Sequence, residues 1–456
     1  MGLPIEIKIT IIELLMSPNE RMKGLGLSRR SVVSANLTRE INHSLPRFLS
    51  VNRELRRVVD TILFARLPLG AMSVHEVQHH LSLLENPLSS RLCNYPTTVS
   101  LSLASWLMPR DWEGDTTGQA LCRQKGRQKD ETTASILKLL TNLSQIELDI
   151  LPFNPLGRFI KWQWWDETIA ALEEIARAAD GVSRPFIRAL ALHAIRPALD
   201  EIMAHMLGAL VPNLNALVLA TDSGYTYNAK DVDFVASWTA IRLRATNLAT
   251  LVVSGVPVPT AIEPWACSQS LRSLDITSAP GLTPTLAHAL ICQFPALRSV
   301  TLRSIRLRFG STFPPRDGPG VSPGTKMLPD LGGLRISPAT TLAESSVDAN
   351  ANTLTCPWNP PISLQTLSLS SLDIDFVAGL SSLGTATLHL QVIHRSTTLL
   401  HLLKRPNTFV GLCRLVVGNE DRMTRGVFGW LGPEQTEELR AICKERGCTF
   451  EDERFS

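Results

Sequence analysis

Residues 271–276 read Leu-Arg-Ser-Leu-Asp-Ile, and this pattern, L-x-x-L-x-L with occasional Val or Ile, recurs through the C-terminal two thirds of the chain. The last two apolar members are two residues apart, so they point to the same side of a β-strand. The first member comes where the chain turns into that strand. The copies are Leu143-Ile146-Leu148, Ile187-Leu190-Leu192, Leu214-Leu217-Leu219, Leu248-Leu251-Val253, Leu271-Leu274-Ile276, Leu297-Val300-Leu302, Leu331-Leu334-Ile336, Leu364-Leu367-Leu369, Leu412-Leu415-Val417 and a poorer one, Leu383-Ala386-Leu388.

One such strand cannot bury its apolar side alone, whereas a stack of them buries a continuous core. Successive copies start 19 to 44 residues apart, and several of these intervals fall near the ~20–29 residues of a leucine-rich repeat. The series from about residue 135 to 420 therefore resembles the leucine-rich-repeat family. The family's Asn or Cys is absent from its usual place, so we expect an irregular solenoid with unequal loops. An ordinary α/β domain with Leu-rich strands is the alternative.

The composition excludes several classes of protein. The chain has 456 residues, with 45 Lys+Arg against 42 Asp+Glu, and this balance does not predict a nucleic-acid or membrane surface. No uncharged apolar run reaches about 18 residues, so we expect no membrane span. The eight cysteines are scattered without a C-x-x-C, which favours reduced thiols in a cytoplasmic or nuclear protein over a disulfide framework or a zinc site.

The N-terminal stretch 3–16 predicts a helix that is apolar on two sides. Pro4 suits the first turn, and Ile7, Ile11, Leu14 and Leu15 form one apolar stripe. A second stripe runs through Ile5, Ile9, Ile12 and Met16. A helix with two apolar faces needs two partners, and the surplus face predicts a docking surface.

This N-terminal region resembles an F-box. Leu3-Pro4-x-Glu6-Ile7 resembles the opening helix of that module, and Phe48-Leu49-Ser50-Val51-Asn52-Arg53-Glu54-Leu55 resembles its closing part in fungal F-box proteins. An insertion at about 17–44 separates the halves, and Asn52 and Leu55 depart from the usual Cys and aromatic residue. F-box modules followed by leucine-rich repeats are a known combination. The expected fold class is therefore α/β, with a small all-α F-box-like module followed by an irregular leucine-rich-repeat solenoid.

The resemblance implies a substrate-recognition subunit of a cullin-type ubiquitin ligase. The F-box would bind a Skp-family adaptor and through it a cullin scaffold, while the repeats would bind an unknown target protein. The expected adaptor-binding residues are Leu3, Pro4, Ile7, Ile11, Leu15, Val51 and Leu55. No nucleic-acid or membrane partner is expected. The alternative is a protein-interaction scaffold of leucine-rich repeats with a degenerate F-box and no ligase role.

Two short motifs suggest an enzyme. His75-Glu76-Val77-Gln78-His79 matches the H-E-x-x-H of zinc peptidases. The same residues also fit a helix with a capping box from Ser73 to Glu76, which we favour. Gly320-Val321-Ser322-Pro323-Gly324 matches G-x-S-x-G, but the surrounding prolines do not suit a nucleophile elbow. We therefore expect no catalytic residues, no metal and no cofactor, and keep the zinc peptidase and serine hydrolase as a third hypothesis.

The remaining pattern divides the chain into three parts: the F-box-like module at 1–67, a connection at 68–134 and the repeats at 135–456. The connection is expected to hold a helix near 73–85, a first strand through Val99 and Leu101, and a polar loop or linker at 108–133. Long loops are expected at about 309–330 and 338–361. Helices are expected at 166–179, 196–209, 230–238, 282–293 and 434–446.

Overall fold

Twelve β-strands form one parallel sheet in the computed structural model, in which β1 to β12 follow one another in chain order. The residues described are 65–87, 90–102, 116–149, 166–177, 187–193, 200–220, 234–259, 264–303, 363–370, 372–393, 398–418 and 431–455. The strands are β1 Arg66–Leu67, β2 Thr98–Ser102, β3 Gln145–Asp149, β4 Ala189–His193, β5 Ala216–Ala220, β6 Thr250–Ser254, β7 Ser273–Thr277, β8 Ser299–Arg303, β9 Ser363–Ser370, β10 Gly384–Gln391, β11 Arg414–Gly418 and β12 Thr449–Asp452.

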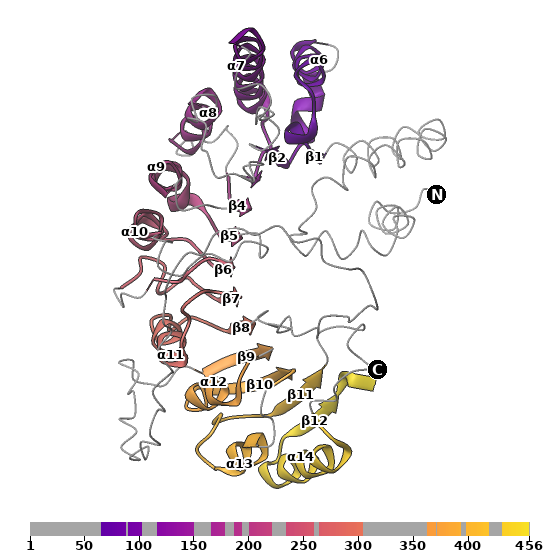
Figure 1. Cartoon of the computed structure of the whole chain (residues 1–456), viewed down its shortest axis with the longest axis vertical. Helices are drawn as coiled ribbons and strands as arrows, with labels where there is room; N and C mark the ends of the chain where they lie inside the picture. Colours follow the sequence, from indigo (N-terminus) through magenta and orange to yellow (C-terminus); the bar gives the residue numbers. More distant parts are fainter. Residues whose placement is uncertain are drawn as a thin grey trace, which may run out of the picture.

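Helices connect most of these strands and lie on one side of the sheet. They are α6 Val74–Glu85, α7 Thr116–Leu139, α8 Asp166–Arg177, α9 Asp200–Leu210, α10 Val235–Arg244, α11 Pro284–Cys292, α12 Ile374–Gly379, α13 Leu399–Lys404 and α14 Pro433–Arg446. Short 3-10 turns occur at Leu69–Ala71, Ser90–Asn94, Val211–Asn213 and Glu453–Phe455. In Figure 1 the strands line the inner side of an arc and the helices line its outer side.

The apolar triplets form the core between the sheet and the helices. Leu217, Leu251 and Leu274 are opposite one another on β5, β6 and β7, and all three are buried. The same row continues on both sides through the other strands, so the core runs continuously along the sheet. The interpretation of the triplets as neighbouring strands is confirmed for every described copy except Leu383-Ala386-Leu388.

One triplet has a different register from the one expected, and another lies outside the described residues. In β10, Leu388 and Leu390 are opposite Leu367 and Leu369, so the buried pair lies two residues later than in Leu383-Ala386-Leu388. The copy at 331–336 lies outside the described residues, and among the described strands β8 pairs directly with β9.

Trp265 fills the outer layer between β6 and β7, where the described residues form turns. Its ring meets Trp238 edge-on, with ring centroids 5.8 Å apart, and Phe294 at 5.5 Å. Trp238 comes from α10, and its Nε1 donates to the carbonyl of Pro257 at 2.9 Å. Aromatic packing therefore continues the outer layer from α10 to α11, in the edge-to-face geometry that aromatic rings prefer.

The prediction of a loop or linker at 108–133 is wrong from Thr116 onward, because α7 begins there. Its side facing the core carries polar residues, which hide the helical period of apolar positions. Lys129 and Asp130 are buried, and the Lys129 Nζ donates to the carbonyl of Met72 at 2.7 Å and to that of Gly70 at 3.4 Å. These contacts satisfy a buried cation that a simple pattern of apolar residues assigns to solvent.

Asp130 caps the first turn of the neighbouring helix α8. Its two carboxylate oxygens accept hydrogen bonds from the backbone N–H of Glu167 at 3.0 Å and of Thr168 at 2.9 Å. The Thr168 hydroxyl donates to the same carboxylate at 2.6 Å. An acidic side chain from α7 thus satisfies amides that a helix leaves unpaired at its N-terminus.

Replacing Asp130 with alanine is expected to lower the free energy of unfolding by about 1–3 kcal/mol, because two helix amides lose their acceptor and one of them is buried. Urea titration followed by circular dichroism measures this difference. The matched control is Glu131→Ala, on an exposed neighbour in the same helix, which should change stability by less than about 0.5 kcal/mol. Equal effects of the two substitutions would contradict the capping role.

Most other predicted helices are confirmed, with shifted ends. The helix expected at 282–293 is α11, and the Thr283 hydroxyl caps it by accepting from Leu286 N–H at 3.2 Å. The helix expected at 230–238 instead covers Val235–Arg244. Arg66 and Leu67 form β1, so the expected helical module does not reach Leu67. The end strands β1 and β12 were not among the predicted strands.

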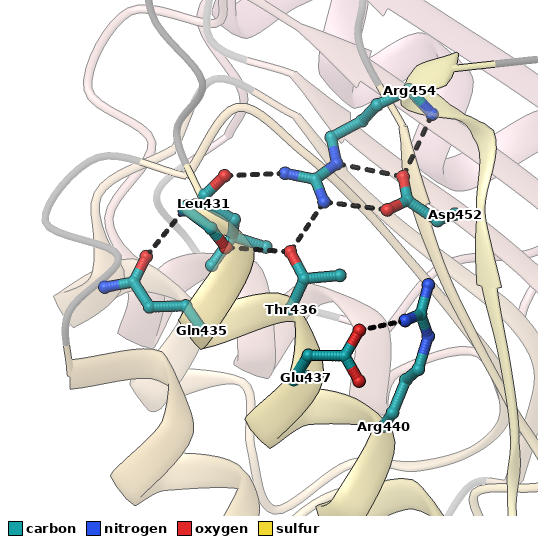
Figure 2. A network of polar contacts seen from close by, with 8 residues as sticks. Leu431, Gln435, Thr436, Glu437, Arg440, Asp452 and Arg454 are labelled. Carbon is teal, nitrogen blue, oxygen red and sulfur yellow. Dashed lines mark hydrogen bonds and ion pairs between the residues drawn. The ribbon is translucent and has the colours of Figure 1, made fainter.

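The C-terminal end of the sheet is fixed by the buried side chain of Arg454 (Figure 2). Its guanidinium donates to the Leu431 carbonyl at 2.8 Å, the Thr436 hydroxyl at 2.7 Å and the Asp452 carboxylate at 2.7 Å. These partners come from the start of α14 and from β12. One side chain therefore ties the last helix to the last strand.

The cysteines partly follow the expectation of reduced thiols. Cys93, Cys267, Cys413, Cys443 and Cys448 carry free thiols. Cys292 forms a disulfide bond, so the expectation is wrong at this position. Among the helices that the structure describes, none combines the length and apolar character needed to cross a membrane.

Candidate functional site: the inner face of the sheet

The inner face is the side of the sheet turned away from the helices, and alternate strand residues point toward it. Strand pairing aligns these residues into rows that run across the sheet. The central row is Ser100, Glu147, Ala191, Val218, Val252, Asp275, Thr301, Ser368, His389, Val416 and Glu451. The exit row, at the carboxyl ends of the strands, includes His193, Ala220, Ser254, Thr277, Arg303, Ser370, Gln391 and Gly418.

A first polar cluster lies at the N-terminal end of this face. Arg66 on β1 forms an ion pair with Glu147 on β3, across the intervening strand β2. The Gln145 side chain donates to the other Glu147 oxygen at 3.4 Å. Burial lowers the pKa of His193 on β4, and the Arg66 charge lowers it further while Glu147 opposes this. Burial therefore disfavours the protonated form of His193, which lies near the paired carboxylate of Glu147.

The middle of the face is apolar. Ala191 and Val218 are buried in the central row, and Val252 continues the row on β6. These side chains carry no group that could transfer a proton or bind a metal. This part of the face can contribute contact area, but it offers no reaction chemistry.

A second polar cluster begins on β7 and β8. Asp275 lies in the central row and Arg303 in the exit row of the next strand. Burial raises the pKa of the Asp275 carboxyl, while the Arg303 charge and the Thr277 hydroxyl, which donates at 3.2 Å, act in the opposite direction. Arg303 itself is exposed.

His389 on β10 completes the second cluster. Its Nε2 lies 3.3 Å from the Gln391 amide nitrogen and 3.7 Å from a Glu453 carboxylate oxygen. Burial lowers the pKa of His389, the Glu453 charge raises it, and the charges of Arg303 and Arg414 lower it again. Gly418 leaves room here, because a Cβ at this position would lie 3.1 Å from the His389 Nε2.

The predicted adaptor-binding residues cannot be placed by the structure. Leu3, Pro4, Ile7, Ile11, Leu15, Val51 and Leu55 all lie outside the described residues. The same holds for Gly320–Gly324, the loops at 309–330 and 338–361, and the tryptophans at 162, 164 and 165.

The H-E-x-x-H segment forms the start of α6, and its capping box is confirmed. The Ser73 N–H donates to the Glu76 carboxylate at 2.7 Å, and the Glu76 N–H donates to the Ser73 hydroxyl at 3.3 Å. This hydrogen bonding lowers the pKa of Glu76. Within the described ranges, no group of three or more His, Cys, Asp and Glu residues is arranged to hold a metal ion.

A cavity of about 760 Å³ lies on the helical side, between α8, α9 and α10. Its floor contains small residues such as Ala204, Gly208 and Ala240, and Arg244 donates to the Gly208 carbonyl at 3.0 Å. Glu173 lines it and pairs with His205 at 2.7 Å. These two contacts join α10 to α9 and α9 to α8.

The inner-face residues were not identified as site residues from the sequence, although the triplets contain the signal. In L-x-x-L-x-L, the residue between the last two apolar members is the central-row residue, as for Glu147 and Asp275. The misaligned copy at 383–388 would place Thr387 in that row instead of His389. Arg66 lies outside every triplet.

Comparison with known proteins does not assign the chain to a family. No protein-family model and no curated protein matches the sequence. Any functional assignment therefore depends on the residues themselves.

Proposed function

We propose that this chain is the substrate-recognition subunit of a cullin-type ubiquitin ligase. The F-box-like residues 1–67 bind a Skp-family adaptor, and the strand–helix units form an irregular leucine-rich-repeat solenoid that holds a target protein. The observation that supports the receptor role most is the strand order. Every strand pairs in parallel with its neighbours in the chain, and the helices leave one face of the sheet for contact with a partner.

In this proposal the protein makes and breaks no covalent bonds. It raises the effective concentration of the target's lysines near a charged conjugating enzyme. The inner face contributes a row of polar and apolar side chains rather than a reaction centre. The capping box at Glu76 supports the same view, since it gives the H-E-x-x-H glutamate a structural role.

The expected adaptor-binding surface is large enough to support association. Burying five large apolar side chains contributes on the order of 10 kcal/mol at ~2 each. Association costs ~4–15 kcal/mol in lost freedom and ordering, so the surface supports binding only if most of these side chains are engaged. Ile7 and Ile11 are one helical turn apart in the expected helix and belong to the same stripe.

Replacing both Ile7 and Ile11 with aspartate is expected to abolish capture of a purified Skp-family adaptor, because two charges would enter an apolar interface. A pull-down with the full chain measures this. The control is Thr10→Asp, which introduces the same side chain at a polar position outside both apolar stripes, and it should retain binding. Adaptor binding that is unchanged by the double substitution would rule out this surface.

The alternative function is a protein-interaction scaffold without a ligase role. Asn52 and Leu55, which depart from the F-box pattern, favour it. It predicts an intact sheet and a functional inner face but no adaptor binding by the wild-type chain. The adaptor experiment therefore separates the two functions.

A further inference from the structure

The exit row of β8 and β9 contains two hydrogen-bond donors, on Arg303 and Ser370, that have no acceptor among the described residues. Arg303, Ser370 and Gln391 occupy equivalent positions on the adjacent strands β8, β9 and β10. The Ser370 hydroxyl is completely buried and has no hydrogen-bond partner. The exposed guanidinium of Arg303 forms no hydrogen bond or ion pair with the described residues, although Asp275 is close enough to feel its charge.

An unpartnered buried hydroxyl is unusual, because buried polar groups are nearly always hydrogen-bonded. Here it lies next in register to Arg303, a cation that has no acceptor among the residues that the structure describes. Gly418 keeps the neighbouring position on β11 free of a side chain. The absence of a side chain at Gly418 leaves space that His389 and Gln391 occupy, and the charge of Arg303 has no carboxylate partner in this row.

We propose that this exit row binds one carboxylate side chain, Asp or Glu, of the protein held on the inner face. Arg303 supplies the charge, because a guanidinium binds a carboxylate through paired N–H donors. The unpartnered Ser370 hydroxyl is a further donor at the equivalent position of the next strand. The proposal rests on the proposed function, since it names what the inner face recognises.

The flanking charges limit the site to a single carboxylate. Asp275 lies on one side of Arg303, and Glu453 lies beyond His389 on the other. Arg414 is already paired with Glu451. A run of acidic residues would meet these carboxylates and be repelled, whereas one acidic residue among neutral neighbours would meet Arg303 alone.

The test uses the full-length protein and two synthetic heptapeptides, Ser-Ala-Val-Glu-Val-Ala-Ser and the same peptide with Gln in place of Glu, both with blocked ends. We expect the Glu peptide to bind at least about tenfold more tightly in a fluorescence anisotropy titration at low salt, with the advantage falling as salt increases. Arg303→Gln should remove the difference. Arg298→Gln, an exposed arginine at the other end of β8, should leave it unchanged.

A second variant distinguishes a direct electrostatic role from a structural one. Asp275→Asn removes the competing negative charge, so it should tighten binding of the Glu peptide several-fold. The imidazole signals in NMR give an independent readout. Bound carboxylate at Arg303 should raise the pKa of His389, which the Arg303 charge lowers, and leave that of His193 in the N-terminal cluster unchanged.

Three results would overturn the proposal. They are equal binding of the two peptides, a Glu preference that survives Arg303→Gln, and saturation by acetate or inorganic phosphate with the same affinity as the peptide. The last result would indicate a site for small anions. None of these outcomes involves the adaptor. The peptide titration can therefore reject the carboxylate site without affecting the ligase role, which the adaptor pull-down tests.

Discussion

Replacing Arg454 with methionine is expected to lower the free energy of unfolding by about 3–5 kcal/mol. Methionine keeps much of the apolar stem but removes every donor of the guanidinium. The Asp452 carboxylate, the Thr436 hydroxyl and the Leu431 carbonyl then lose their partner in a buried setting (Figure 2). Breaking a buried charge pair by removing one member typically costs this much, because the other charge stays uncompensated.

The matched control is Arg440→Met. Arg440 makes the same kind of ion pair with Glu437, but both side chains are exposed. Surface pairs contribute less than about 1 kcal/mol, so this variant should be close to wild type. Chemical denaturation at neutral pH measures both. If Arg454→Met is as mild as Arg440→Met, the buried network does not hold the end of the sheet.

The Arg454 network also predicts a dependence on acid. Its hydrogen bonds hold the pKa of Asp452 below the ordinary value of 3.8. An acid with a lowered pKa contributes stability that is fully present above its ordinary pKa and is lost as the pH falls through the lowered value. The difference in stability between wild type and Arg454→Met should therefore be constant near neutral pH and shrink below about pH 4.

The second large effect concerns Lys129 and appears at alkaline pH. Burial lowers its pKa from 10.5 to about 8. Between these two values the unfolded chain holds a proton that the folded chain has lost, so stability rises with pH in this window. The wild type should gain about 2–3 kcal/mol relative to Lys129→Met between pH 8 and 10, at ~1.4 kcal/mol per unit.

Denaturant titrations at several pH values give this difference directly. Lys138→Met is the control, because Lys138 is on the same helix but is half exposed and paired with Glu174. The difference in the free energy of unfolding between wild type and Lys138→Met should not change over the same pH range. A flat difference for Lys129→Met would show that the lysine is not desolvated in the folded protein.

The fold could be predicted where the spacing of nearby residues determines which side chains are buried. Leu271, Leu274 and Ile276 are spaced as a strand that buries one side, and neighbouring copies pair in register. The Ser73–Glu76 capping box was likewise readable, because its residues are three apart in the chain.

Prediction failed where the stabilising partner is distant in sequence. Lys129 can be buried because its ammonium group donates hydrogen bonds to the backbone carbonyls of residues 70 and 72. Asp130 can be buried because its carboxylate caps a helix that begins at Asp166. No local pattern contains these partners, so the polar segment was interpreted as a loop. The predicted register of β10 was wrong for a related reason. Leu383 and Leu390 are both apolar, and only pairing with β9 decides which positions are buried.

The second polar cluster of the inner face could not be predicted for the same reason. Asp275, Arg303 and His389 come from β7, β8 and β10, and 86 residues separate Arg303 from His389. The sheet brings them to one end of the inner face by placing β8 directly beside β9. The sequence contains their identities, but the pairing determines their neighbours.

The central claim is that the N-terminal apolar segment binds an adaptor while the sheet presents the partner surface. The most direct test is a calorimetric titration of the purified full-length chain with a Skp-family adaptor. The account predicts one adaptor per chain with a dissociation constant of about 1 µM or tighter, equal to ~8 kcal/mol, and loss of binding in the Ile7→Asp, Ile11→Asp variant. Absence of binding by the wild-type chain, with the sheet folded, would contradict it.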